Sequence, residues 1–191
     1  MSVFDRCFEH TVGLEGGYYN HPKDKGGPTM YGVAWNFNKK WYNKVGITRS
    51  DEVANLTLEQ AKEIYFLKYW KPSKCDKFEQ YKDLVKTYFD MCIHAGITGT
   101  GICLQKAINV ILLGESDDLY LDGKVGSKTL AGLNKVLDKV YDPDEELNET
   151  NFVTVYNAQR AAYYLEMYND IDNPSWYGNL RYLNSGLRRL A

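Results

Sequence analysis

NLTLEQAKEIYFLKYW, residues 55–70, is the segment that decides the fold class. Thr57 is a residue type that favours a helix N-cap, and Gln60 follows it three positions later. This spacing is the capping-box pattern, in which two side chains satisfy the free amides at the start of a helix. The segment therefore predicts a helix that begins at Thr57.

Helical patterns also occur on both sides of this segment. Before it, Phe4, Phe8 and Val12 recur at helical spacing, and aromatic residues do so over residues 33–45. After it, helices are predicted over residues 78–94, 101–113, 127–140, 151–169 and 176–190. The predicted fold is mainly α.

One stretch breaks this pattern. Residues 16–32, GGYYNHPKDKGGPTMYG, combine glycines, prolines and aromatic residues without a helical period, which predicts a structured loop or a short hairpin. Gly13 and Gly16 end the preceding helix, so Glu15 is expected just beyond a helix end. Functional residues concentrate in loops of this kind.

The length of 191 residues, 44% of them hydrophobic, suits one compact domain over residues 1–191. The segment YDPDEELNET at residues 141–150 resembles a linker, but too little chain follows it to form a second core, so it is interpreted as an inter-helix loop. No run of eighteen apolar residues occurs, and Asp5, Glu9 and His10 stand where a signal peptide needs an apolar stretch. We expect a protein that neither spans a membrane nor is secreted by the usual route.

The charge of the chain bears on its partners. A net charge of −2 argues against a nucleic-acid binder, which must neutralise many phosphates. Residues 20–50 nevertheless carry six basic residues and a single acid, Asp24. A basic face suits an anionic polymer such as peptidoglycan, although solvated lysines are the commoner explanation.

The four cysteines and three histidines show no metal-binding spacing and no CxxC pair. We therefore expect no metal site and no cofactor. Buried free thiols are the favoured interpretation of the cysteines, with a disulfide as the alternative.

Hydrolysis of a glycosidic bond needs a proton donor and a second group that attacks or activates water, and two carboxylates usually supply them. Glu15 and Asp24 are placed to face one cleft, and the Thr29 hydroxyl can hold a water. Asp24 can instead cap its own turn, and Thr29 can be a turn residue. Tyr18 and Tyr31 are the aromatic residues expected to stack on sugar rings.

The spacing of these residues resembles a known family. E-G-G-Y at residues 15–18 and D-x-G-G-x-T-x-x-G at residues 24–32 are similar to the opening of glycoside hydrolase family 108, whose members are N-acetylmuramidases. The resemblance continues through L-T-x-E-x-A at 56–61, I-Y-x-x-x-Y-W at 64–70, F-D-x-x-x-x-x-G at 89–96 and L-Q-K-A at 104–107. His21 and His94 depart from it, standing where aspartate and asparagine are usual.

The resemblance implies a lysozyme-like fold and a set of roles. Glu15 takes the place of the general acid of the family, and the order Glu15, Asp24, Thr29 is similar to the catalytic triad of phage-type lysozymes. LDGKVGSKTL at residues 121–130 resembles part of a C-terminal peptidoglycan-binding region. These likenesses imply a catalytic region over residues 1–95, with a helical, peptidoglycan-binding-like region over residues 96–191 packed on it.

The implied activity is hydrolysis of the β-1,4 bond between N-acetylmuramic acid and N-acetylglucosamine in peptidoglycan. The implied protein is a monomeric bacteriophage endolysin that accumulates in the host cytoplasm and reaches the cell wall through a holin, and a bacterial secretion-activator homologue is the alternative origin. A lytic transglycosylase is the first rival activity, and Asp24 weighs against it because that mechanism needs no second carboxylate. A non-catalytic peptidoglycan-binding protein is the second rival.

Overall fold

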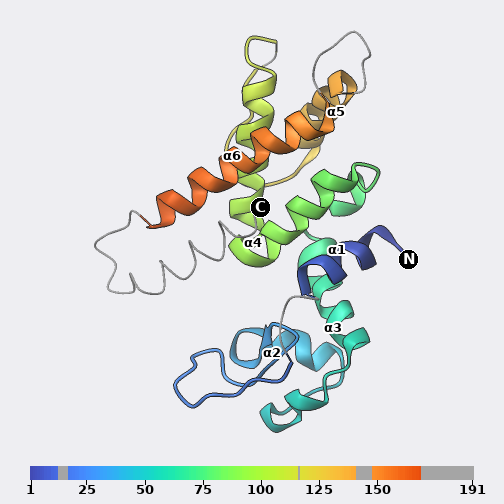
Figure 1. Ribbon diagram of the computed structural model, residues 1–191, viewed down its shortest axis with the longest axis vertical. Coiled ribbons are helices and arrows are strands. Elements are labelled where there is room, and N and C mark those ends of the chain that lie inside the picture. The colour runs from blue at the N-terminus through green and yellow to red at the C-terminus, as the bar shows by residue number, and fades with distance from the viewer. Residues whose placement is uncertain (13–16, 116, 141–147, 169–191) are drawn as a thin grey trace. The chain divides into compact units, whose positions relative to one another are not determined.

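The computed structural model describes residues 1–12, 17–115, 117–140 and 148–168, and it is mainly helical, as Figure 1 shows. The mainly α prediction is thus confirmed, together with the small hairpin. The predicted helix over residues 176–190 and the first seven residues of the predicted loop at 141–150 lie outside the described residues. The chain divides into two compact units, Met1–Asp76 and Lys77–Ala191, and each is described by itself.

The first unit holds short helices and one hairpin. In chain order its elements are α1 (Val3–Val12), β1 (Thr29–Met30), β2 (Val33–Ala34), α2 (Trp35–Lys44), the 3-10 helix η1 (Ser50–Asn55), α3 (Leu58–Tyr65) and the π-helical turn η2 (Phe66–Trp70). A further 3-10 turn, η3 (Cys75–Lys77), follows. The start of α3 is as predicted: the Gln60 amide donates to Thr57 Oγ1 at 3.2 Å, and the Thr57 amide donates to Gln60 Oε1 at 2.9 Å.

Aromatic side chains form the core between α1 and α3. The ring of Phe8 meets that of Tyr65 edge-on at 5.4 Å between centroids, and Phe4 meets Trp70 edge-on at 5.3 Å. Phe8, Tyr65 and Trp70 are each buried. Edge-to-face pairs of this kind add to the hydrophobic gain from burying large rings. These contacts pack α1 against α3 and η2.

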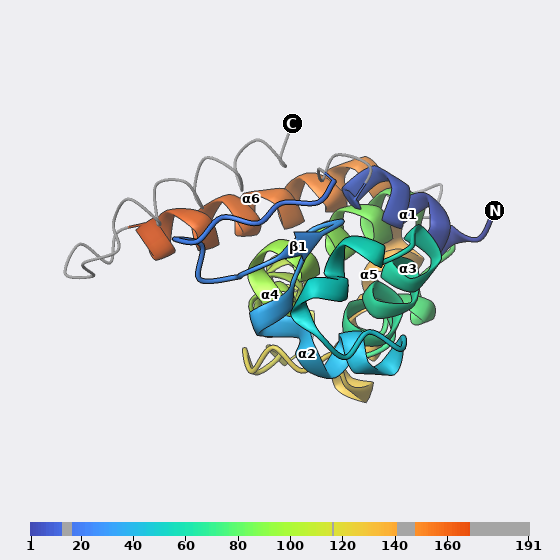
Figure 2. The same cartoon turned by 90° about the horizontal axis from the view of Figure 1, so that it is seen from below.

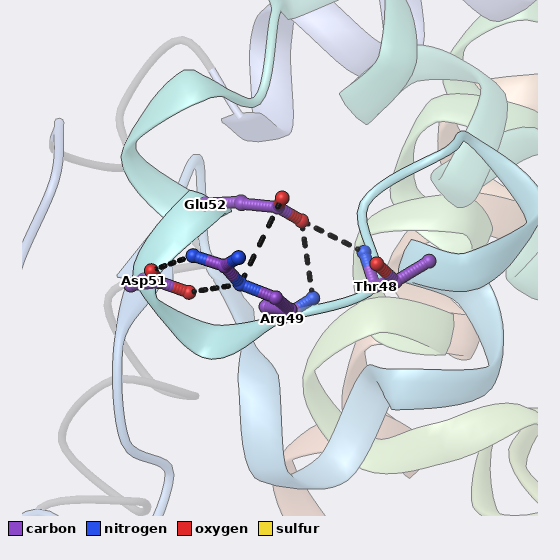
Figure 3. A network of polar contacts seen from close by, with 4 residues as sticks. All are labelled: Thr48, Arg49, Asp51 and Glu52. Atoms are coloured by element: carbon purple, nitrogen blue, oxygen red, sulfur yellow. Dashed lines mark hydrogen bonds and ion pairs between the residues drawn. The ribbon is translucent and has the colours of Figure 1, made fainter.

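A small polar network precedes η1 (Figure 3). The Glu52 carboxylate accepts the backbone amides of Thr48 and Arg49, each at 3.1 Å. The Arg49 guanidinium pairs with Asp51, with its Nε 3.0 Å from Asp51 Oδ1. Hydrogen bonding and the nearby carboxylates raise the pKa of Arg49, while the same hydrogen bond lowers the pKa of Asp51. The charge of Arg49 is therefore compensated locally.

In the part of the second unit that the structure describes, the helices are α4 (Lys82–Ile111), α5 (Ser127–Val140) and α6 (Glu149–Tyr168). The prediction of separate helices over residues 78–94 and 101–113 is confirmed in outline: α4 is two helical stretches joined at a kink, where Gly96 has non-helical dihedrals (φ 81°, ψ 158°). Only glycine adopts this left-handed conformation without strain. The predicted boundary between residues 95 and 96 lies at this kink, whereas the compact units divide between Asp76 and Lys77. The division into a catalytic and a binding region stays a prediction.

A buried ion pair joins α4 to α6, which lie side by side in Figures 1 and 2. Arg160 Nη2 on α6 donates to Asp90 Oδ2 on α4 at 3.1 Å, and both side chains are buried. Removing one partner of such a pair would leave an uncompensated charge in the interior. This pair therefore fixes how the two helices pack.

None of the helices in the described ranges combines the length and the apolar character needed to cross a membrane.

Candidate active site

The loop predicted to carry the active site folds as a small antiparallel sheet. Thr29 pairs with Ala34, and Met30 with Val33, across β1 and β2. Tyr19 adds a bridge on the other side of β1, because its amide donates to the Thr29 carbonyl at 2.9 Å and its carbonyl accepts from the Thr29 amide at 2.8 Å. Tyr18, next to this bridge, is 47% exposed. Its ring is therefore accessible to a ligand.

Tyr31 and Gly32 form the tight turn between the two strands. Both have positive φ, 49° and 73°, as a two-residue type I′ hairpin requires. A bulky residue is uncommon in this conformation and is strained there. The Tyr65 hydroxyl on α3 donates to the Tyr31 carbonyl at 3.0 Å, which holds the turn in place. The half-buried Tyr31 side chain is thus presented from a backbone fixed by a second element.

Asp24 occupies an exposed turn between two glycine-rich segments. Its Oδ1 accepts the Gly26 amide at 2.7 Å, and its carbonyl accepts the Gly27 amide at 3.1 Å. This is the turn-capping arrangement that the sequence leaves open as an alternative. Among the described residues, the other carboxylate oxygen has no hydrogen-bond partner, so one oxygen remains available to a water or a substrate.

Thr29 is linked to the same turn through its side chain. Its hydroxyl donates to the Gly27 carbonyl at 3.1 Å. Gly27 therefore connects the two predicted site residues, because its amide binds Asp24 and its carbonyl binds Thr29. The hydroxyl oxygen of Thr29 can still accept a hydrogen bond from water.

The start of α2 supports this turn, a contact that sequence reasoning missed. The amides of Trp35 and Asn36 donate to the carbonyls of Pro28 and Gly26 at 2.9 and 3.0 Å. The Asn36 side chain donates to the Lys25 carbonyl at 3.0 Å. The free amides at the start of α2 thus hold the glycine turn. In the sequence, the only signal of this contact is the polar residue Asn36 in the first turn of the helix.

Lys68 on η2 is a second group that the sequence reasoning did not single out. Its ammonium donates to Asn38 Oδ1 at 2.6 Å, and burial lowers its pKa. It borders, with Gly32 and Tyr65, a cavity of about 20 Å³ beneath the hairpin. That volume suits a single water.

Glu15, the predicted general acid, lies outside the described residues. The structure brings Asp24 and Thr29 together on one turn, and it places Tyr18 beside the Tyr19 bridge and Tyr31 in the turn of the same small sheet. Within the described ranges, no group of three or more histidine, cysteine, aspartate or glutamate side chains is arranged to hold a metal ion.

The segment predicted to resemble a peptidoglycan-binding region borders a cavity of about 720 Å³ in the second unit. Polar residues of this segment line it beside apolar residues of α4, among them Lys124, Ser127, Lys128, Ile108 and Leu112. A cavity of this size, with mixed lining, is large enough for a small ligand or part of a polymer.

Gln105 on α4 shapes the edge of this cavity. Its side-chain amide donates to Asp122 Oδ1 at 2.9 Å and to Thr129 Oγ1 at 3.2 Å, and its carbonyl oxygen accepts the Gly123 amide at 2.9 Å. The hydrogen bond from Gln105, together with that from the Lys124 amide, lowers the pKa of Asp122. The L-Q-K-A motif at residues 104–107 and the LDGKVGSKTL segment at residues 121–130 are therefore physically connected.

Comparison with known proteins agrees with this picture. Residues 8–96 match the family model described as Glycosyl hydrolase 108. None of the curated proteins compared with the chain matches it. Among solved structures, "Structure of Brucella abortus SagA" is similar at 25% sequence identity with a TM-score of 0.62, over 98% of this chain and 93% of that one. The family match supports a glycosidase that hydrolyses peptidoglycan.

Proposed function

We propose that the protein is an N-acetylmuramidase, which hydrolyses the β-1,4 bond between N-acetylmuramic acid and N-acetylglucosamine in peptidoglycan. The observation that carries the proposal is the family match over residues 8–96, because this range contains Glu15 and the whole hairpin loop. The arrangement of Asp24 and Thr29 around Gly27 is compatible with it.

In the proposed reaction Glu15 is the general acid and water is the acceptor. The protonated Glu15 carboxyl donates to the oxygen that leaves, while Asp24 remains ionised. Because Gly26 binds only one oxygen of Asp24, the other can direct the water or face the positive charge that develops on the sugar ring. Thr29 assists as an acceptor for the same water, and Tyr18 and Tyr31 contact sugar faces.

The first prediction concerns the products and the acid. Purified protein should release muropeptides that end in reducing N-acetylmuramic acid, measured by mass spectrometry of digested sacculi. Glu15→Gln should lower the rate by at least about 10²- to 10⁴-fold, because the amide keeps the shape of the side chain but cannot supply the proton. Its melting temperature and circular dichroism spectrum should match those of the wild type.

The rival activities give different results in the same assay. 1,6-Anhydro-muropeptides as the main product would identify a lytic transglycosylase, and reducing N-acetylglucosamine ends would identify a glucosaminidase. Binding to sacculi without release of any fragment would identify a non-catalytic peptidoglycan-binding protein. Near-wild-type lysis by Glu15→Gln would make Glu15 a turn residue and would remove the proposed chemistry.

The proposal extends to residues 96–191 as a peptidoglycan-binding region packed on the catalytic one. The cavity of about 720 Å³ beside residues 121–130 supports this role, since its lysines, aspartates and hydroxyls offer hydrogen-bond partners to a polar glycan. The protein as a whole is proposed to be a monomeric endolysin that binds neither nucleic acid nor membrane. It is held in the host cytoplasm until a holin gives it access to the wall.

A further inference from the structure

One side of α2 carries aromatic and basic side chains that the proposed reaction does not use. The side begins at Phe37 and continues with Lys40, Trp41 and Lys44, which follow Phe37 by three, four and seven positions. Residues at these spacings share one side of a helix. Phe37 is 70% exposed, both lysines are exposed, and Trp41 is half-buried. We call these four residues the α2 face.

The two lysines of the α2 face converge on one ring. Lys40 Nζ lies 5.0 Å and Lys44 Nζ 5.3 Å from the centroid of the Trp41 ring. Cation–aromatic attraction favours this placement, but two like charges one helical turn apart repel each other. The face therefore concentrates positive charge beside an aromatic surface.

Neither lysine forms an ion pair with a carboxylate of the described residues. Two other basic groups of the same unit are compensated: Arg49 pairs with Asp51 (Figure 3), and Lys62 lies 3.5 Å from Asp5 and 3.4 Å from Glu59. The α2 face differs from Arg49 and Lys62 because its two lysines are held beside Trp41 without a neighbouring carboxylate among the described residues. Such a surface attracts an anionic ligand.

The α2 face is continuous with the candidate active site. A Cβ at Gly26 would lie 3.6 Å from Phe37 Cε2, so the Phe37 ring borders the turn that Asp24 caps. From Phe37 the face runs to Lys44, which is about 10 Å along a helix axis. That length is comparable with a disaccharide, so a polymer in the site has room to extend over the face.

We propose that the α2 face binds the carboxylate-bearing glycan strand of peptidoglycan next to the bond that is cut. Phe37 contacts the apolar side of a sugar, and Lys40 and Lys44 pair with the free carboxylates of the stem peptides. Peptidoglycan fits both features, since it offers sugar rings and regularly spaced carboxylates along one chain. The identity of the ligand rests on the proposed function, whereas the basic, aromatic character of the surface does not.

The test measures binding separately from hydrolysis. The full chain with Glu15→Gln is titrated with purified sacculi, and bound protein is measured by co-sedimentation. Lys40→Gln with Lys44→Gln should weaken binding roughly fivefold, the effect of losing two exposed ion pairs. Phe37→Ser should weaken binding by a similar factor. Raising the salt concentration should narrow the difference caused by the two lysine substitutions, because salt screens charges, and should leave the effect of Phe37→Ser in place.

A control pair removes the same amount of charge from other places. Lys39 lies about 200° around the helix from Phe37, outside the face. Lys71 is an exposed lysine that directly follows the end of η2. Lys39→Gln with Lys71→Gln should bind sacculi like the parent protein. Unchanged melting curves establish that all variants are folded.

A second arm identifies the chemical group. Coupling methylamine to the carboxyls of sacculi with a carbodiimide should reduce binding of the parent protein to the level of the Lys40→Gln, Lys44→Gln protein. Equal binding by the α2-face and control variants, or no effect of amidation, would overturn the proposal. The proposal would also be overturned if the α2-face variants lost binding to phosphatidylglycerol vesicles while their binding to sacculi stayed unchanged. The face would then be a lipid-binding surface.

The outcome is independent of the muramidase assignment. If the wild type releases no muropeptides, the proposed reaction fails, but a specific loss of sacculus binding in the α2-face variants still supports the surface. If muropeptides are released and the α2-face variants bind normally, the surface proposal alone fails.

Discussion

At the scale of single residues, Asp24 combines two roles that a substitution can separate. Asparagine keeps an oxygen that accepts the Gly26 amide, and it therefore preserves the turn while removing the charge. The second prediction is that Asp24→Asn lowers kcat by about 10²-fold, with an unchanged melting temperature. Asp24→Ala, which removes the cap as well, should also lower the melting temperature.

Turnover of muropeptides and thermal unfolding are measured for both variants. If Asp24→Asn is as active as the wild type while Asp24→Ala is destabilised, Asp24 is a turn residue and not a participant in the reaction. The backbone contacts of Asp24 alone do not distinguish these roles, because both use the same conformation of the turn.

Tyr31 gives the third prediction, in which stability and activity change in opposite directions. Its φ of 49° is costly for a tyrosine, and asparagine before glycine is the preferred pair in a type I′ turn. Tyr31→Asn should therefore stabilise the fold by roughly 0.5–1 kcal/mol. The same change should raise KM for sacculi several-fold, since the ring proposed to contact sugar is lost.

Tyr31→Ala is the matched control. It also removes the ring, but alanine is strained at this positive φ, whereas asparagine tolerates it. It should raise KM as Tyr31→Asn does, without the gain in melting temperature. A KM equal to that of the wild type in both variants would exclude Tyr31 from the substrate site.

The sequence predicts the residue types of the site better than their contacts. Spacing put Asp24 and Thr29 forward as site residues, which stays a prediction, and the turn-capping contact of Asp24 was anticipated as the alternative. The hydrogen bonds that Asn36 and Tyr65 donate to the loop were not predicted. Each of them joins residues that are far apart in the chain, at separations of 11 and 34 positions. No local pattern records such pairs.

At the scale of elements, local signals predicted the start of α3 and the break within α4. The Thr57 capping box was confirmed because all its bonds lie within three positions of the chain. Separate helices were predicted over residues 78–94 and 101–113, and α4 does break between them, at the non-helical Gly96. The need for glycine at residue 101 could not be predicted, because it comes from tertiary packing: a Cβ there would lie 2.1 Å from the Gly123 carbonyl oxygen.

The backbones of α4 and of the segment that follows it approach closely at Gly101 and Gly123. Gln105 is the main polar link between these two parts of the chain. Gln105 is 1% exposed, and it satisfies the buried Gly123 amide and the Thr129 hydroxyl. The fourth prediction is that Gln105→Leu lowers the free energy of unfolding by about 2–3 kcal/mol, because it leaves buried polar groups unpaired. Urea denaturation followed by circular dichroism measures this change.

Asn134→Ala on α5 is the control for this measurement. Asn134 is exposed, so its replacement should change stability by less than about 0.5 kcal/mol. If Gln105→Leu were equally mild, the hydrogen bonds of Gln105 would not be what connects the two motifs.

At the scale of the whole molecule, the sequence predicted the class of the fold and the state of its cysteines. Mainly α structure follows from helical periodicity, which is a local property of the chain. The division into units at Asp76 and Lys77 was not predicted, because it depends on which helices pack together and no composition change marks it. The proposed boundary after residue 95 was inferred from family resemblance instead.

The cysteines give the fifth prediction. Cys7, Cys75, Cys92 and Cys103 are all buried and free, which confirms the favoured interpretation of the sequence. Burial raises the pKa of the Cys103 thiol to about 12, so this group stays protonated at neutral and moderately alkaline pH. Because the thiolate is the reactive form, a buried and protonated thiol reacts slowly with disulfide reagents.

We expect a chromogenic disulfide reagent to label the native protein slowly at pH 8 and to titrate all four thiols once guanidinium chloride has unfolded it. Dithiothreitol should leave the melting temperature unchanged, since the fold contains no bond among these cysteines that it can reduce. A fall in melting temperature with dithiothreitol, or fewer than four thiols in the unfolded protein, would reveal a disulfide. Stability therefore has to come from packing, such as the ring contacts of α1 with α3 and the Asp90–Arg160 pair between α4 and α6.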